Sequence, residues 1–143
     1  LLPRADVPVV QISVNPFLDG ETQFRIGQAL QGLGEEGILV IGSGGTVHNL
    51  RRIHFGQTRP EAWAVEFDDW LLERIRENDF SSLFAYDRIA PNARLAVPRA
   101  EHFVPFLLAL GSGGKQPQAE VLHRSYEYGT LSYLAVRFSE QPQ

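Results

Sequence analysis

The first half of the chain alternates short apolar segments with a stretch of helical periodicity. Val7 to Val14 is rich in β-branched residues and is followed by Asn15 and Pro16, which predicts a strand that leaves into a loop. From about residue 20, apolar residues recur at helical spacing until two glycines end the pattern. These apolar positions are Ile26, Leu30 and Leu33. The all-apolar run at 38–41, bounded by glycines, is typical of a strand buried on both faces of a parallel sheet.

The second half begins with the strongest helical pattern of the chain, directly after Pro60 and Glu61. Its apolar face comprises Trp63, Phe67, Trp70, Leu71 and Ile75, and its polar positions comprise Glu66, Asp68, Glu73 and Arg74. Residues 78–94 predict a short helix plus a loop, and Pro98 predicts the start of another helix that ends at Gly111. Residues 119–126 and 130–138 predict two extended segments, broken at Gly129, that form either a hairpin or two edge strands.

This order of elements predicts one α/β domain over residues 1–143. We expect a largely parallel sheet flanked by helices, with antiparallel strands at the C-terminal end. Ligands of such sheets bind beyond the carboxyl ends of the strands. The loop at 42–45 (GSGG), directly after the second predicted strand, is therefore the expected place for chemistry.

Composition narrows the classes of function. The 143 residues include 43% hydrophobic side chains, enough for one core, and a net charge of -4 argues against a nucleic-acid partner. No apolar run approaches the ~20 residues of a membrane span, and no leader pattern is present, so we expect a soluble, cytoplasmic protein. The chain has no cysteine, so His, Asp or Glu must hold any metal. It has no methionine either, which suggests a segment of a longer polypeptide.

The most informative stretch is GILVIGSGGTVHNL. Gly44 and Gly45 let a ligand approach the backbone, and His48 follows within a turn, where its imidazole can act as an acid and a base near neutral pH. A histidine that merely holds the loop by hydrogen bonds fits this spacing equally well. A dinucleotide loop fits less well, because the sixth position counted from Gly42 is Val47 and the lysine of a phosphate-binding loop is missing.

Two further histidines are candidates. Glu101 and His102 fall in the first turn of the helix predicted from Pro98, where the helix dipole keeps an imidazole neutral and available to a metal. A capping Glu beside a partly buried His explains the same spacing. His123 alternates with apolar residues in a predicted strand, so it either faces a pocket or is a satisfied strand histidine.

In order and spacing, PVVQISV, GILVIGSGGTVHNLR, AWAVEFDDW, VPRAEHFVPFLLALG and YEYGTLSYLAVRF resemble class III extradiol ring-cleavage dioxygenases, in particular the DOPA 4,5-dioxygenase branch. The resemblance extends from about Pro8 to Phe138. It implies a non-haem metal, Fe(II) or Zn(II), that binds a catechol and dioxygen for opening of the ring beside its hydroxyls.

The resemblance also implies roles for individual residues. His48 matches the active-site histidine after the glycine loop, an acid and base for the catechol hydroxyl and a neighbour or ligand of the metal. His102 matches the last metal ligand. We assign substrate binding to Gly44, Gly45 and His123. The family's two further histidine ligands come from an amino-terminal segment that would precede this chain, and Val97 replaces a histidine that the family often carries before proline.

The sequence therefore predicts the carboxy-terminal part, or one subunit, of an extradiol dioxygenase whose site is completed by an N-terminal segment or a partner subunit. Exposed apolar surface on a split sheet also predicts self-association. Two alternatives stay open. One is a non-catalytic binding or scaffold subunit of the same fold, and the other is a nucleotide- or phosphate-binding α/β module that uses the GSGG loop.

Overall fold

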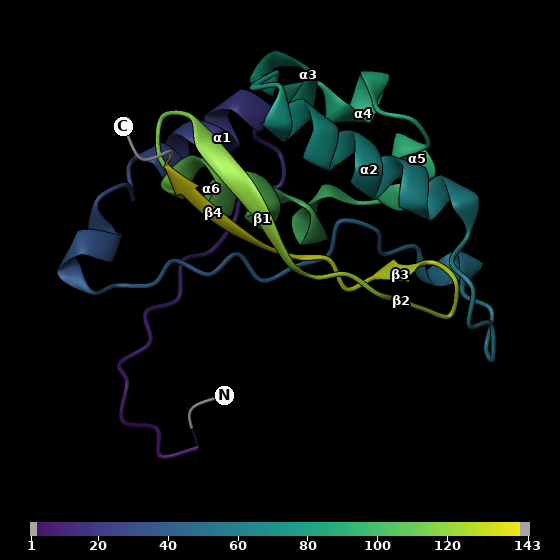
Figure 1. Cartoon of the computed structure of the whole chain (residues 1–143), viewed down its shortest axis with the longest axis horizontal. Coiled ribbons are helices and arrows are strands. Elements are labelled where there is room, and N and C mark those ends of the chain that lie inside the picture. The colour runs from purple at the N-terminus through teal and green to yellow at the C-terminus, as the bar shows by residue number, and fades with distance from the viewer. Residues whose placement is uncertain (1–2, 141–143) are drawn as a thin grey trace.

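The computed structural model describes residues 3–140 and comprises, over that range, six α-helices, three 3₁₀ helices and four strands (Figure 1). The α-helices are α1 (Gly20–Gln28), α2 (Ala62–Arg76), α3 (Phe80–Phe84), α4 (Tyr86–Ile89), α5 (Ala93–Ala96) and α6 (Val104–Ser112). The 3₁₀ helices are η1 (Leu33–Glu36), η2 (Leu50–Arg52) and η3 (Ala100–His102). The strands are β1 (Pro117–His123), β2 (Tyr126–Glu127), β3 (Leu131–Ser132) and β4 (Ala135–Glu140).

Helix α1 packs against α6 through glycines that let the two backbones touch. A Cβ on Gly27 would lie 2.1 Å from the carbonyl oxygen of Leu108, and a Cβ on Gly111 would lie 2.1 Å from that of Phe24. The predicted helix is confirmed, but it ends at Gln28, and its buried face differs from the expected one. Ile26 is exposed, because the glycine face turns toward α6.

Helix α2 confirms the strongest sequence prediction and supplies much of the core. Its buried residues are Ala64, Phe67, Asp68, Leu71 and Ile75. Trp63 and Trp70 are partly buried against this core, as their place on the apolar face predicts. The polar assignment of Asp68 is wrong, because this side chain faces the interior and is fully buried.

The segment from residue 78 to 112 is more helical than the sequence predicts. It forms α3, α4 and α5 where one short helix was expected, and Asp79 caps α3 by accepting a hydrogen bond from the Ser82 N–H (3.2 Å). The helix predicted from Pro98 begins later. The chain first makes the 3₁₀ turn η3, and α6 follows with Pro105 in its first turn.

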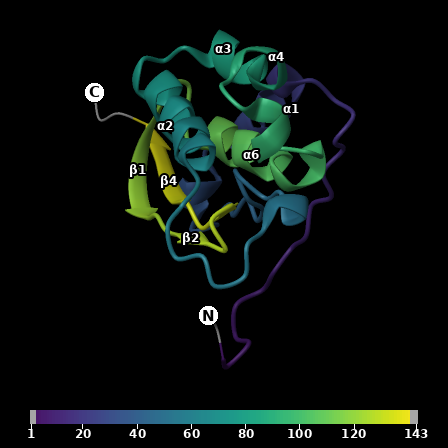
Figure 2. The ribbon, with the colours of Figure 1, turned by 90° about the vertical axis from the view of Figure 1, so that its right-hand side faces the viewer.

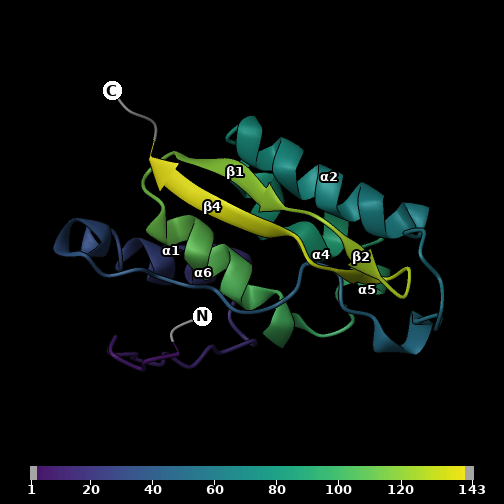
Figure 3. The same cartoon turned by 60° about the horizontal axis from the view of Figure 1, so that its bottom comes forward.

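The C-terminal segments form an antiparallel hairpin, as predicted. Strand β1 pairs with β4, with Val121 opposite Val136, and the shorter strands β2 and β3 pair beyond a bulge near His123. Figure 3 shows the hairpin between α2 on one side and α6 with α1 on the other. The hairpin therefore joins the two helical layers.

The predicted parallel sheet is absent from residues 3–140. Segments 7–14 and 38–41 are extended but belong to no strand, and their apolar side chains are exposed, Val10 at 87% and Leu39 at 79%. In Figures 1 and 2 the N-terminal segment runs away from the helices. The prediction of two strands was therefore wrong for this chain alone, because both segments lack the neighbouring strands that a ladder requires.

A membrane-spanning helix does not occur within residues 3–140. None of the helices described there has both the length and the apolar character that crossing a bilayer requires.

Candidate functional site: a histidine pair beside an open cavity

The glycine loop lies directly against the backbone that precedes and begins α6. A Cβ on Gly44 would lie 2.1 Å from the carbonyl oxygen of His102, and a Cβ on Gly42 would lie 2.3 Å from that of Pro105. The Gly45 N–H donates a hydrogen bond to the same His102 carbonyl (2.8 Å). The glycines therefore have a packing role, because only a residue without a side chain permits this approach.

The backbone on either side of His48 is fixed from two directions. The His48 N–H donates to the Ala96 carbonyl of α5 (3.0 Å), and the Ser132 N–H of β3 donates to the Val47 carbonyl (3.0 Å). His48 also forms an isolated antiparallel bridge with Leu131. The hairpin and α5 thus hold the segment that carries the first candidate residue.

The structure brings His48 and His102 together, although they are distant in the sequence. Their ring centroids lie 5.1 Å apart in an edge-to-face arrangement, with an interplanar angle of 66°. His48 is half-buried, whereas His102 is exposed. His102 lies in the 3₁₀ turn η3, before α6 begins. The predicted position in the first turn of a helix, on which the expected dipole effect depended, is therefore wrong.

Both ring nitrogens of His48 face main-chain carbonyls. Nδ1 lies 3.0 Å from the Gly45 oxygen and Nε2 lies 3.0 Å from the Arg99 oxygen. A neutral imidazole carries one N–H, so it satisfies one carbonyl and turns a lone pair toward the other. With a second proton the ring would donate a hydrogen bond to each carbonyl. The surroundings of the ring therefore favour its acceptance of a proton.

Burial opposes that second proton. Desolvation lowers the pKa of His48 below its ordinary 6.5, and the nearby His102 acts in the same direction. The hydrogen bonds to the Arg99 and Gly45 carbonyls and the charge of Glu101 favour the protonated ring. The net effect is a lowered pKa, because burial outweighs the groups that favour the charged ring.

The described residues supply only part of a metal-ligand set. No group of three or more His, Asp or Glu side chains within residues 3–140 is arranged to hold a metal ion. The exposed ring of His102 can offer a nitrogen, but His48 can do so only by leaving one of its carbonyl partners. Imidazole nitrogens fit the chemistry of a non-haem metal, but two of them are fewer than the ligands that such a metal takes.

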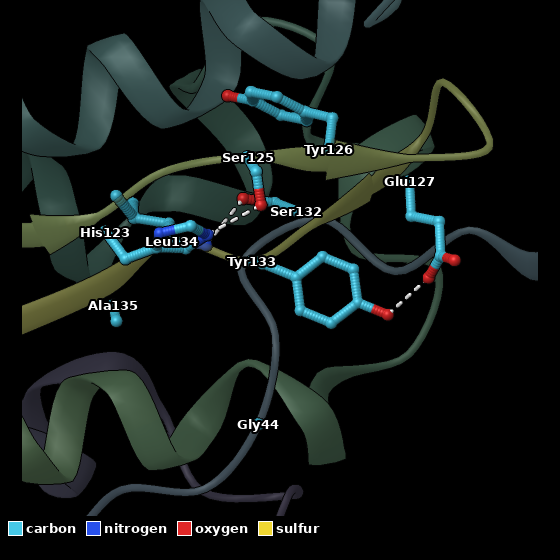
Figure 4. Close-up of a pocket in the computed structure, with 9 residues that line it drawn as sticks. All are labelled: Gly44, His123, Ser125, Tyr126, Glu127, Ser132, Tyr133, Leu134 and Ala135. Carbon is cyan, nitrogen blue, oxygen red and sulfur yellow. Dashed lines mark hydrogen bonds between the residues drawn. The ribbon is translucent and has the colours of Figure 1, made fainter. Parts of the chain in front are cut away.

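An open cavity of about 630 Å³ lies between the hairpin and the glycine loop (Figure 4). His123, Tyr133 and Glu127 line it from the hairpin, and Gly44 lines it from the opposite side. His123 Nε2 pairs with the Ser125 hydroxyl (2.7 Å), and the Tyr133 hydroxyl donates to Glu127 (2.7 Å). Neither His48 nor His102 lines this cavity. Gly44 is the link between the cavity and the pair, because it lies against the His102 backbone.

The three residues assigned to substrate binding thus fall in different places. Gly44 and His123 line this cavity, whereas Gly45 is not among its lining residues and instead anchors the loop to His102. Val97 lines a separate cavity of about 530 Å³ together with Arg99 and Ala100.

The site also contains residues that the sequence did not single out. The Arg99 carbonyl holds the ring of His48, and Asp68 binds the hydroxyls of Tyr126 and Ser132, which line the cavity. One available signal was the spacing of Ala64, Asp68, Leu71 and Ile75, which places the carboxylate on the apolar face of α2.

Comparison with known proteins identifies the class of this fold. A family profile described as "Catalytic LigB subunit of aromatic ring-opening dioxygenase" matches residues 1–139. The chain belongs to this family, and the recognition made from its sequence motifs is confirmed.

Individual relatives agree with this assignment. The chain is 40% identical over 140 residues to a 4,5-DOPA dioxygenase extradiol of Portulaca grandiflora, covering 97% of this chain and 52% of the relative. It is 28% identical over 144 residues to a protein of the same name in Escherichia coli, covering 96% and 52%. A crystal structure of an uncharacterized Escherichia coli K12 protein superposes with a TM-score of 0.83 at 30% identity, covering 96% of this chain and 57% of that one.

The chain spans about half the length of the curated relatives it matches.

Proposed function

We propose that this chain forms one part of an extradiol ring-cleaving dioxygenase that acts on a catechol with dioxygen and a non-haem metal, Fe(II) or Zn(II). The observation that carries the proposal is the edge-to-face pair of His48 and His102, which is linked to the open cavity through Gly44. Membership of the ring-opening dioxygenase family supports it.

His102 would hold the metal together with ligands from the remainder of the protein. His48 would become a further ligand only after a ring movement and in place of its role as acid and base. When bound, the metal supplies Lewis-acid polarisation of the substrate oxygens. His48 accepts a catechol proton and later returns it, since its carbonyl partners favour the protonated ring and burial favours the neutral one. His123, with Ser125, offers a hydrogen bond to a substrate oxygen in the cavity.

We also propose that the remainder of the protein completes the sheet. Segments 7–14 and 38–41 flank α1, an arrangement that would give parallel strands joined by a helical crossover. Their exposed aliphatic side chains suit strands that pair with another segment or subunit. Within this proposal, residues 1–143 are the carboxy-terminal portion of one longer domain, or a subunit of it that self-associates when alone.

The experiment is oxygen uptake by the product of the whole gene, loaded with Fe(II) and supplied with catechols, among them DOPA. We expect uptake that depends on the catechol, together with the absorbance of a ring-opened product. A protein that takes up metal yet consumes no oxygen with any catechol would favour the non-catalytic alternative. Stabilisation by nucleotides, with none by metal or catechol, would favour the phosphate-binding alternative.

A further inference from the structure

A buried carboxylate connects α2 to the hairpin that lines the cavity. Asp68 Oδ2 accepts hydrogen bonds from the Tyr126 hydroxyl (2.7 Å) and the Ser132 hydroxyl (2.6 Å). The Asp68 side chain is fully buried, whereas Tyr126 and Ser132 reach the cavity surface. Figure 4 shows the Tyr126 ring directed toward the helix behind the hairpin, away from the cavity side on which Tyr133 lies.

Ser132 transmits this anchor to the segment of His48. Its side chain donates to Asp68, while its backbone N–H donates to the carbonyl of Val47, the residue directly before His48. The adjoining residue Leu131 makes the bridge to His48 itself. A shift of β3 would therefore move the backbone that carries the imidazole.

Arg124 makes a second set of hydrogen bonds that connects the hairpin to α2. The Arg124 guanidinium donates to the Tyr126 hydroxyl (3.0 Å), to Asp69 (2.6 Å) and to the Val65 carbonyl (3.1 Å). Asp69 is exposed, in contrast to Asp68. Two adjacent carboxylates of α2 thus bind the same hairpin, one inside the core and one at the surface.

One oxygen of the buried Asp68 carboxylate has no hydrogen-bond partner. Asp68 Oδ1 and the Thr46 hydroxyl are both buried and make no hydrogen bond. Thr46 lies two residues before His48, and its hydroxyl is close enough to Asp68 to lower the pKa of that carboxyl. The carboxylate therefore faces the His48 segment as well as the hairpin.

We infer that Asp68 is a positioning residue for the candidate site: it fixes β3 and the segment 46–48, and through them the ring of His48. Burial of a carboxylate costs free energy because its charge loses contact with water. An apolar residue at this position would avoid that cost, so the carboxylate is there for its hydrogen bonds. The role as a positioning residue in catalysis rests on the proposed function, but the placement of the His48 ring does not.

The test compares Asp68→Asn with Asp69→Asn in the 143-residue chain, by NMR of the His48 ring nitrogens and by hydrogen exchange of backbone amides. In Asp68→Asn we expect the ¹⁵N signals of the His48 ring to shift. The Ser132 amide, which binds Val47, should exchange about tenfold faster or more, which corresponds to one hydrogen bond to a charged group. Asp69→Asn should leave both readouts as they are.

A merely structural role would accelerate exchange throughout the core, α6 included, whereas positioning confines it to residues 46–48 and 130–132. Uniform acceleration, or an unchanged His48 ring in folded Asp68→Asn, would overturn the inference. If Asp68→Asn does not fold, Ser132→Ala removes one donor and keeps the carboxylate, and it should produce the same local effect. Lack of oxygen uptake by the whole protein, with these NMR results intact, would refute the proposed function alone.

Discussion

The imidazole rings of His48 and His102 meet edge to face with centroids 5.1 Å apart, although one follows a glycine loop and the other precedes α6. Their proximity depends on Gly44, which lies against the His102 carbonyl, and on the hydrogen bond from Gly45 to that same oxygen. The pair is therefore a product of backbone packing as much as of side-chain chemistry.

Substitution of Gly44 by alanine tests this packing. The added Cβ would overlap the His102 carbonyl, so the loop must move away from α6 and the hydrogen bond from Gly45 must lengthen. We expect Gly44→Ala to lower the free energy of unfolding by about 1–3 kcal/mol, the usual cost of overpacking. Urea denaturation measures this change.

Gly34→Ala is the matched control, because no atom lies within 4 Å of the position that its Cβ would occupy. It should change stability little. Equal stability of the two variants would contradict the close approach of the loop to α6.

His48 and His102 should differ in their contribution to stability. His48 links two carbonyls, those of Gly45 and Arg99, whereas His102 is exposed. We expect His48→Ala to cost about 1–3 kcal/mol, the value of one or two hydrogen bonds, and His102→Ala to cost less. Thermal denaturation of the two variants checks the order, and the reverse order would show that the His48 ring is not held as described.

The elements that could be predicted from the sequence are those whose packing partners lie within the chain. The apolar spacing of α2 and the alternating segments of the hairpin both correspond to the structure, because a helix face and a hairpin find their contacts within the chain. The apolar runs at 7–14 and 38–41 indicated a need for burial but could not show which neighbours would provide it.

The candidate site was predictable only in part. The local spacing of residues does not predict that His48 and His102 lie close together. Their assignment to one site depended on the resemblance of whole motifs to a known family. The main-chain oxygen of Arg99 has no sequence signature, since every residue carries a carbonyl. Asp68 was assigned to the polar face because acidic residues are seldom buried without a partner, and its partners lie far along the chain in the hairpin.

The free energy of unfolding should depend on pH through Asp68. Burial raises the pKa of this carboxyl above 3.8, although the hydrogen bonds from Ser132 and Tyr126, the nearby Thr46 hydroxyl and the charge of Arg124 oppose the shift. A carboxyl with a raised pKa binds more protons in the folded than in the unfolded protein. Stability from this group is therefore present below pH 3.8 and is lost as the pH rises through the folded pKa.

Denaturation of the wild type and of Asp68→Asn across this pH range measures the effect. We expect the wild type to lose stability relative to the variant as the pH rises, because asparagine does not titrate. A constant difference between the two proteins, or one that changes in the opposite direction, would show that Asp68 is not desolvated.

The exposed segment 38–41 should tolerate charge in the isolated chain. Leu39 is 79% exposed, so Leu39→Lys should leave the thermal midpoint nearly unchanged and reduce self-association, as measured by sedimentation velocity. Ile89→Lys, at an exposed position of α4, is the control and should not alter association. Loss of folding in Leu39→Lys would mean that this segment is buried in solution.

The most direct measurement is the metal content of the whole gene product and of two of its histidine variants, determined by mass spectrometry after loading with Fe(II) or Zn(II). His102→Ala removes one ring of the pair, whereas His54→Ala removes an exposed histidine outside it. Metal content should fall by about tenfold or more in His102→Ala and stay at the wild-type level in His54→Ala. Metal retained by His102→Ala at the wild-type level would contradict a shared metal at this pair.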